Sequence, residues 1–186
     1  MEGKSTEGWG WMNPPEKWES QSGTITISTL PNTDFWVKTH YGFTRKSGHF
    51  YHTIVEGDFE VSCSFSGNYQ DQYDQAGLML MQDEHNWIKA GIEFVDGIQR
   101  ISAVITRGYS DWSKLTPKQF PEYLKIKLLR KGDFVQASYA LDDGTYEMYR
   151  LGYFDPAGPV KVGVMAASPE GKGFRVHFRD FQISTG

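Results

Sequence analysis

The stretch Trp87-Ile88-Lys89-Ala90-Gly91-Ile92-Glu93-Phe94, followed by Val95-Asp96-Gly97, decides the fold class. Its even-numbered residues are apolar, whereas its odd-numbered residues carry an indole, an ammonium, no side chain and a carboxylate in turn. This period of two is typical of a β-strand that has one face in a core. The Asp-Gly pair supplies the positive φ angles of a two-residue turn, and residues 101–107 form the next strand-like run. We therefore predict an antiparallel hairpin.

The same alternation recurs along the chain, and no helical periodicity persists for more than a couple of turns. Lys131-Gly132 and Asp143-Gly144 separate two further pairs of strand-like runs. Turn signals that recur every 8 to 12 residues are typical of a sandwich or barrel. We predict an all-β fold, a two-sheet antiparallel jelly-roll sandwich, with strands at residues 23–30, 34–39, 50–54, 58–65, 76–81, 87–95, 101–107, 123–130, 134–141, 146–150, 160–167 and 174–183.

Composition sets the broad class of the protein. The chain has 186 residues, 39% of them hydrophobic and 15% aromatic, which is enough for one packed core, so we expect residues 1–186 to form a single domain. A net charge of -4 argues against nucleic-acid and membrane partners. Cys63 is the single cysteine, so no internal disulfide forms, and the first residues lack an apolar signal core. We expect a cytoplasmic protein without a cofactor.

The last predicted strand contains a change of parity. Its apolar residues are even-numbered over 174–178 and odd-numbered over 181–183, so one inserted residue is expected near Asp180, as in a β-bulge. Asp58 and Asp180 could together hold a structural calcium ion. Two carboxylates fall well short of the 6 to 8 oxygen ligands that calcium takes, so the sequence does not predict a metal site.

Longer segments, taken in chain order, carry a resemblance to a known family: Trp11-Met12-Asn13-Pro14-Pro15, Thr33-Asp34-Phe35-Trp36, Thr39-His40-Tyr41-Gly42-Phe43, Gly48-His49-Phe50, Gly57-Asp58-Phe59-Glu60, Tyr73-Asp74-Gln75-Ala76-Gly77-Leu78, Asn86 to Phe94, Thr106-Arg107-Gly108-Tyr109-Ser110-Asp111-Trp112-Ser113 and Ala166-Ala167-Ser168-Pro169. With these segments the chain resembles a family of concanavalin A-like domains that includes a fungal regulator of enolase. The resemblance covers nearly the whole chain and implies a jelly-roll sandwich with one concave sheet. It implies no particular chemistry, because one fold hosts many functions.

The polar face of the opening stretch is the main candidate site. Trp87, Lys89 and Glu93 share one face, with a side-chain-free gap at Gly91 where a ligand could approach the backbone. If this strand belongs to the concave sheet, these side chains form the floor of a groove. The alternative is an ordinary solvated face with an ion pair between Lys89 and Glu93.

Neighbouring segments add groups that suit a sugar-like ligand. Tyr73 and Gln75 open the preceding strand, and Arg107, Asp111 and Trp112 close the following one. Aromatic rings stack on the apolar faces of sugars, while amide, hydroxyl and charged groups bond their hydroxyls. We expect Lys89 and Arg107 to donate to ligand oxygens and Glu93 and Asp111 to accept from hydroxyls. Loop packing is the alternative role for Tyr73 and Trp112.

A second group of candidates surrounds the Gly-rich segment 42–48. His40 and His49 flank it, so two strands of one hairpin could bring them to a common rim, and Trp36 could line that rim. Zinc would need three or four ligands at fixed spacing, which are not legible here. We expect these histidines to hydrogen-bond within the fold or to contact a ligand.

These patterns favour a non-catalytic binding domain that recognises a carbohydrate or a small polar metabolite in the concave-face groove. One alternative is a regulatory protein partner of a metabolic enzyme such as enolase, which the family resemblance suggests. The other is a glycoside hydrolase, since this fold also carries glycosidases. Such an enzyme needs two carboxyl groups at a set distance, and Glu93 and Asp111 are the only candidates we assign to that role.

Overall fold

The computed structural model describes residues 8–186, and the regular structure within that range is entirely β. The strands are β1 (Gly10–Met12), β2 (Lys17–Gln21), β3 (Thr24–Ser28), β4 (Phe35–Val37), β5 (Thr44–Lys46), β6 (His49–Val55), β7 (Phe59–Gly67), β8 (Gln75–Asp83), β9 (Asn86–Val95), β10 (Ile98–Arg107), β11 (Ser110–Leu115), β12 (Leu124–Lys131), β13 (Phe134–Ala140), β14 (Tyr146–Tyr153), β15 (Val160–Ala167) and β16 (Arg175–Thr185). In residues 8–186 there is no helix that is long and apolar enough to cross a membrane.

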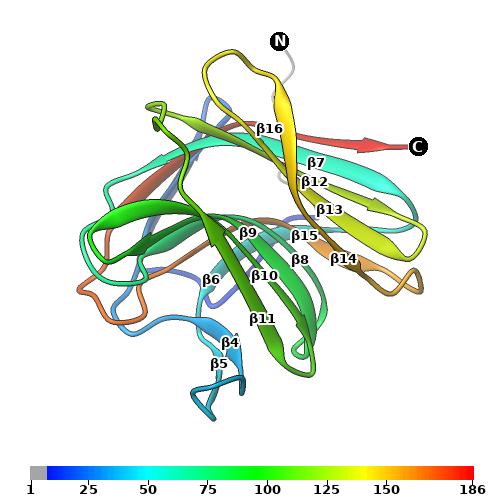
Figure 1. Ribbon diagram of the computed structural model, residues 1–186, viewed down its shortest axis with the longest axis horizontal. Coiled ribbons are helices and arrows are strands. Elements are labelled where there is room, and N and C mark those ends of the chain that lie inside the picture. Colours follow the sequence, from blue (N-terminus) through cyan, green and yellow to red (C-terminus); the bar gives the residue numbers. More distant parts are fainter. Residues whose placement is uncertain (1–7) are drawn as a thin grey trace.

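Two seven-stranded antiparallel sheets pack face to face (Figure 1). The first sheet has the order β1-β6-β15-β8-β9-β10-β11, and the second has the order β14-β13-β12-β7-β16-β3-β2. Sequence neighbours often lie in different sheets, as β7 and β8 do, which is the crossing pattern of a jelly roll. The predicted two-sheet sandwich is therefore confirmed.

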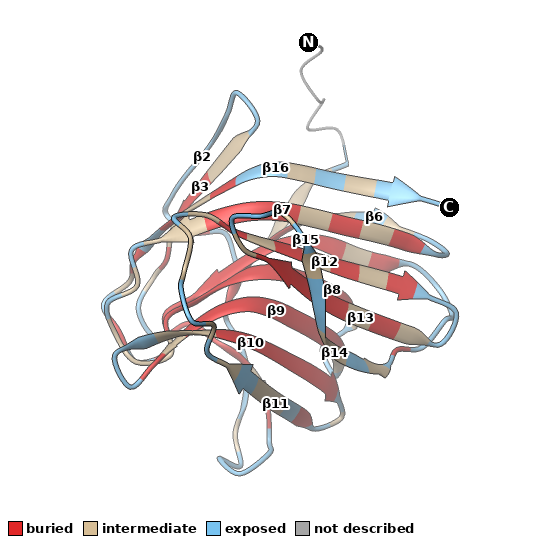
Figure 2. Ribbon diagram, turned by 45° about the horizontal axis from the view of Figure 1, so that its top comes forward, coloured by how far each residue is buried: buried red, intermediate tan, exposed pale blue. Residues whose placement is uncertain are grey.

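The core between the sheets follows the predicted parity. Ile88 and Ile92 of β9 belong to the same core cluster as Val61 and Phe65 of β7 in the other sheet, and all four side chains are buried. Figure 2 shows that β8, β9 and β10 are buried along most of their length. Cys63 lies in the same core, where burial raises the pKa of its thiol, so it packs as a small apolar side chain.

The turns and the bulge also form where the sequence predicts them. Asp96 and Gly97 have φ angles of 53° and 75°, and they join β9 to β10. In β16 the pairing with β7 shifts between Arg179 and Gln182, and Asp180 has a φ of 54°. Asp58 instead accepts a hydrogen bond from the backbone of Gly132, and within residues 8–186 no group of three potential metal ligands gathers.

Four strands were not predicted from the sequence. β1 and β5 have three residues each, and β2 is exposed along its whole length, so none of them shows the alternation of a half-buried strand. Residues of β11 were expected to close the preceding strand, but a turn at Gly108 returns the chain and β11 becomes the edge of the first sheet.

A segment that we call the strap, residues 31–48, crosses the outer face of the first sheet, on the side away from the second sheet (Figure 1). It contains the hairpin of β4 and β5. The strap buries Phe35 and Val37 against outward-facing side chains of the first sheet, which form a second core: Phe50, Met79, Met81, Trp87, Val104, Met165 and Ala167. The outer face is therefore partly filled by the strap, and only the remainder is open.

Candidate functional site

A pocket of about 420 Å³ lies between the strap and the first sheet. Its volume is in the range of small-molecule sites in proteins. The strap, the sheet and two neighbouring loops all contribute to its lining, which consists of Asn32, Asp34, Trp36, Tyr41, Phe43, Arg45, Tyr73, Gln75, Lys89, Glu93, Trp112, Pro169 and Glu170.

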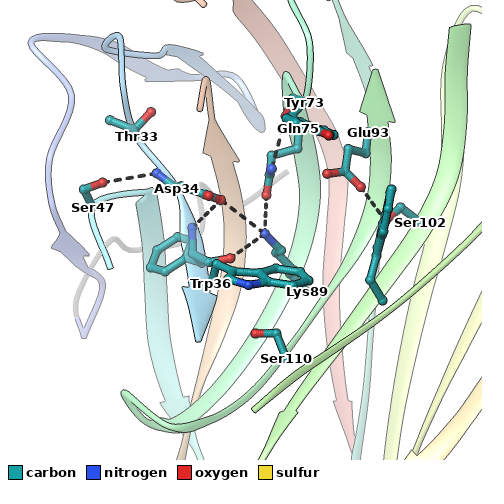
Figure 3. Close-up of polar contacts among 12 residues, drawn as sticks. Thr33, Asp34, Trp36, Ser47, Tyr73, Gln75, Lys89, Glu93, Ser102 and Ser110 are labelled. Carbon is teal, nitrogen blue, oxygen red and sulfur yellow. Dashed lines mark hydrogen bonds and ion pairs between the residues drawn. The ribbon is translucent and has the colours of Figure 1, made fainter. Parts of the chain in front are cut away.

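Lys89 ties the strap to the floor of the pocket (Figure 3). Its ammonium donates to the backbone carbonyl of Phe35 at 2.7 Å and to Oε1 of Gln75 at 2.6 Å. Oδ1 of Asp34 lies 3.6 Å from the same nitrogen, and both side chains of this ion pair are largely buried. Because two of the three N–H donors are occupied within the protein, Lys89 retains at most one for a ligand.

Glu93 is the second charged group of the floor, and it belongs to the sheet alone. Its Oε2 accepts a hydrogen bond from Ser102 on β10 at 3.1 Å, and Ser102 in turn accepts one from Nε1 of Trp112 at 3.1 Å. Burial raises the pKa of Glu93, although the charge of Lys89 and the hydrogen bonds from Ser102 and Trp112 oppose that shift. The carboxylate is thus only partly compensated by the protein.

Five aromatic rings surround these charges: Trp36, Tyr41, Phe43, Tyr73 and Trp112. On the strap, Tyr41 stacks on Phe43 with ring centroids 5.4 Å apart and meets Trp36 edge-on at 5.6 Å. Across the pocket, Tyr73 has a left-handed backbone with a φ of 68°. A hydrogen bond with Tyr73, together with burial, raises the pKa of Tyr41 to about 12, so the strap also meets the turn that precedes β8.

The structure brings six of the predicted ligand-binding residues to this pocket. They are Trp36, Tyr73, Gln75, Lys89, Glu93 and Trp112. Whether they bind a ligand stays a prediction. The alternative, an ion pair between Lys89 and Glu93 on a solvated face, does not form. Lys89 pairs with Asp34 instead, and both Lys89 and Glu93 are buried.

Trp87 does not lie in the pocket, so its predicted place on the groove floor is wrong. It has the same parity as Lys89, but the strap covers this end of β9 and Phe35 packs edge-on against the indole at 6.2 Å. Only 1% of Trp87 is exposed. Gly91 also has a packing role, because a Cβ there would lie 2.1 Å from the backbone oxygen of Ala76.

Arg107 is outside the pocket, contrary to its predicted place at the border, and Asp111 lines an adjoining hollow with Trp36 and Trp112 but not the pocket itself. Arg107 ends β10 and places its guanidinium 5.2 Å from the ring centroid of Tyr153. Asp111 precedes Trp112 directly in an extended strand, so the two side chains leave opposite faces. Asp111 pairs with Arg150 of β14 at 2.8 Å, and thus the predicted pairing of Glu93 with Asp111 in one pocket does not form.

The two histidines do not share a rim. His49 begins β6 and is buried, with Nδ1 donating to the carbonyl of Asn13 at 2.7 Å and Nε2 accepting from the backbone of Leu30 at 2.9 Å. Burial lowers the pKa of His49, so it acts as a neutral structural bridge. His40 lies at the exposed tip of the strap, against Tyr41.

Sequence reasoning missed several residues of the pocket, namely Asn32, Phe43, Arg45, Pro169, Glu170 and, behind Glu93, Ser102. Asp34 and Tyr41, which the sequence analysis names only within the segments of the family resemblance, also line the pocket. Ser102 had a usable signal, because it sits on the polar parity of the strand that follows Asp96-Gly97 and pairs with Gly91. The others depend on where the strap lies, which no local pattern specifies.

One relative of the chain has a name that refers to a function. A Saccharomyces cerevisiae protein named Regulation of enolase protein 1 is 34% identical over 174 residues, which cover 94% of this chain and 88% of that protein. A crystal structure of a functionally unknown protein from Saccharomyces cerevisiae matches with a TM-score of 0.92 at 34% identity, over 96% of this chain and 97% of that one.

More distant structures share the fold alone. The GH43 protein BlXynB from Bacillus licheniformis matches with a TM-score of 0.74 at 13% identity, over 95% of this chain and 36% of that chain. Lectin I-B4 from Griffonia simplicifolia matches with a TM-score of 0.56 at 10% identity, over 97% and 94%. These likenesses confirm the concanavalin A-like sandwich. Residues 11–186 match the family described as protein of unknown function DUF1349, and the chain belongs to that family.

Proposed function

We propose that this protein is a binding domain that recognises a carbohydrate or another small polar metabolite in the pocket beneath the strap, without transforming it. The observation that carries the proposal is the combination of five aromatic rings with a buried, partly compensated carboxylate, Glu93, in a pocket of about 420 Å³. Rings and a few convergent polar groups are the usual composition of a site for a small polar ligand.

We propose a role for each part of the pocket. Trp36 and Trp112 offer ring faces for the apolar side of a ligand, and Glu93 accepts hydrogen bonds from its donors. Lys89 contributes mainly by holding Phe35 and Gln75 in place. The pocket is therefore preorganised by the fold, which lowers the entropic cost of binding.

Thermal unfolding in the presence of a panel of neutral sugars, sugar phosphates and small metabolites tests this proposal. A ligand at about 100 times its Kd stabilises by about 2.7 kcal/mol, which corresponds to a Tm increase of roughly 5 to 10 °C for a chain of this size. Trp112→Ala should abolish the shift, whereas Tyr109→Ala, which removes an exposed ring outside the pocket, should preserve it. A panel without any stabilising compound contradicts the proposal.

A second candidate is regulation of a metabolic enzyme, and the name of the yeast relative favours it. We propose that such a role, in the cytoplasm, would use exposed surface outside the pocket. Capture of purified enolase by the immobilised protein tests it directly. Capture that Trp112→Ala leaves unchanged supports a surface separate from the pocket, and absence of capture at micromolar concentrations argues against the role.

A glycosidase remains the third candidate because of Glu93. A carboxyl group whose pKa is raised by burial is suited to act as a general acid. The carboxylates that share its pocket are Asp34 and Glu170, in place of the expected Asp111. Release of reducing sugar from oligosaccharides, lost in Glu93→Gln, would make the protein an enzyme.

A further inference from the structure

The charges that line the pocket do not balance. Among residues 8–186, three carboxylates and two cations contribute to the lining, so one negative charge is left over. Asp34 is matched by Lys89 at 3.6 Å, and this pair lies within the floor. Arg45, whose guanidinium lies 4.2 Å from the ring centroid of Phe43, is half-buried, and Glu170 is exposed to solvent. Glu93 is buried like Asp34 but forms no ion pair with another described residue, so the surplus falls on the buried Glu93.

Glu93 is held by neutral donors. Ser102 donates to its Oε2, and Ser102 itself is held by the indole of Trp112. The residue is only 9% exposed, so water can compensate little of the charge. Its pKa is raised by burial in spite of Lys89, which agrees with an anion that lacks a full counter-charge. A buried carboxylate in this state favours a positively charged partner.

The rings favour the same kind of partner. Cations bind over the faces of Trp, Tyr and Phe, and sites for ammonium groups are commonly built as cages of such rings. Trp36, Tyr41 and Phe43 of the strap form one cluster, and Tyr73 and Trp112 line the pocket from the sheet side. A neutral sugar could stack on these rings, but it would leave the charge of Glu93 without a counter-ion.

We infer that the ligand is a small organic molecule with a positively charged nitrogen, which binds beside Glu93 and among the five rings. The inference rests on the proposed function and narrows its ligand class. An amino sugar and a small quaternary ammonium compound both carry this chemistry. The charged nitrogen would contact the Glu93 carboxylate, and its substituents would lie against ring faces.

Matched pairs of probes separate charge from shape. Isothermal titration calorimetry at neutral pH compares glucosamine, which is then mostly protonated, with glucose, and choline with its uncharged isostere 3,3-dimethyl-1-butanol. We expect the charged member of at least one pair to bind roughly tenfold or more tightly than its neutral counterpart, because charge-assisted contacts are about twice as strong as neutral ones. The pair that shows the difference identifies an amino sugar or a quaternary ammonium compound.

Two variants complete the test. Glu93→Gln keeps the side-chain shape and an oxygen that can accept from Ser102, and it should weaken binding of the charged probe by roughly tenfold or more. Glu56→Gln, at an exposed turn outside the pocket, should leave binding unchanged. Equal affinity within both pairs, or full affinity in Glu93→Gln, overturns the inference while leaving the proposed function intact. Failure of all four probes overturns the inference, and failure of the thermal-unfolding panel as well overturns the proposed function.

Discussion

Replacing Lys89 by Met tests whether one buried ammonium holds the strap on the sheet. In the native fold Lys89 donates to the carbonyl of Phe35 and to Gln75, and it faces Asp34. Only 7% of the lysine side chain and 12% of the aspartate side chain are exposed. Met has a similar length and fills the space of the aliphatic stem, so the change removes the charge and its hydrogen bonds with little loss of packing.

The expected cost is large. Removing one partner of a buried ion pair leaves the other charge uncompensated and typically lowers the free energy of unfolding by about 3 to 5 kcal/mol. Domains of about this size lose roughly 2 to 4 °C of Tm per kcal/mol, so the Tm should fall by about 6 to 20 °C. The carbonyl of Phe35 and the amide oxygen of Gln75 also lose their donor, which adds to the cost.

Urea unfolding monitored by tryptophan fluorescence measures the effect. The matched control is Lys46→Met, because Lys46 pairs with Glu84 at 2.7 Å but both side chains are more than half exposed, at 58% and 52%. Solvent screens an exposed pair and it contributes little to stability, so this control should be nearly neutral. Adding Asp34→Asn to Lys89→Met should recover part of the loss, since the uncompensated carboxylate is then gone. A Lys89→Met variant that is as stable as the Lys46→Met control would refute the assigned role of Lys89.

Two further predictions concern the same sheet. Because burial raises the pKa of Glu93, the folded state binds its proton more tightly than the unfolded state, and wild-type stability falls as the pH rises from the ordinary carboxyl pKa through the raised one. The Glu93→Gln variant should therefore become more stable relative to wild type as the pH rises through this range. Urea unfolding at a series of pH values measures the difference. A difference in stability that does not change with pH would count against a raised pKa of Glu93. Gly91→Ala should lower the free energy of unfolding by several kcal/mol, roughly the cost of forcing a methyl group into a packed site. The reason is that the new Cβ would lie 2.1 Å from the backbone oxygen of Ala76. Gly10→Ala is the control, because nothing lies within 4 Å of a Cβ at that position. Equal Tm values for the two variants would show that the contact between a Cβ at residue 91 and the Ala76 oxygen does not affect stability.

The sandwich was predictable because its signals are local. Alternation along β9, the turn at Asp96-Gly97 and the parity change near Asp180 each occupy fewer than a dozen consecutive residues, and all three have the expected structure. The alternation follows directly from the geometry of an extended chain. Short or exposed strands such as β2 lack a buried face, so they leave no such pattern in the sequence.

The pocket was only half predictable because the strap covers the sheet from a distance in sequence. Parity correctly placed Trp87, Lys89 and Glu93 on one face of β9, but it has no information about what lies above that face. Phe35, more than 50 residues away, covers Trp87 and leaves Glu93 in the pocket. The same limit explains Arg107 and Asp111, whose partners Tyr153 and Arg150 come from the edge strand of the other sheet.

Lys89 shows why a charged side chain on the correct face need not be the one that meets a ligand. An ammonium that donates to a ligand and an ammonium that anchors a covering segment have identical parity and identical neighbours along the strand. They differ only in whether acceptors of the protein itself, such as the Phe35 carbonyl, already occupy the N–H donors. Because the strap takes the positive charge, the part of the floor still open to a ligand is dominated by Glu93, and the expected ligand changes from an oxygen-rich acceptor to a donor or a cation. The path of the strap thus sets the chemistry of the pocket as much as the residues of the sheet do.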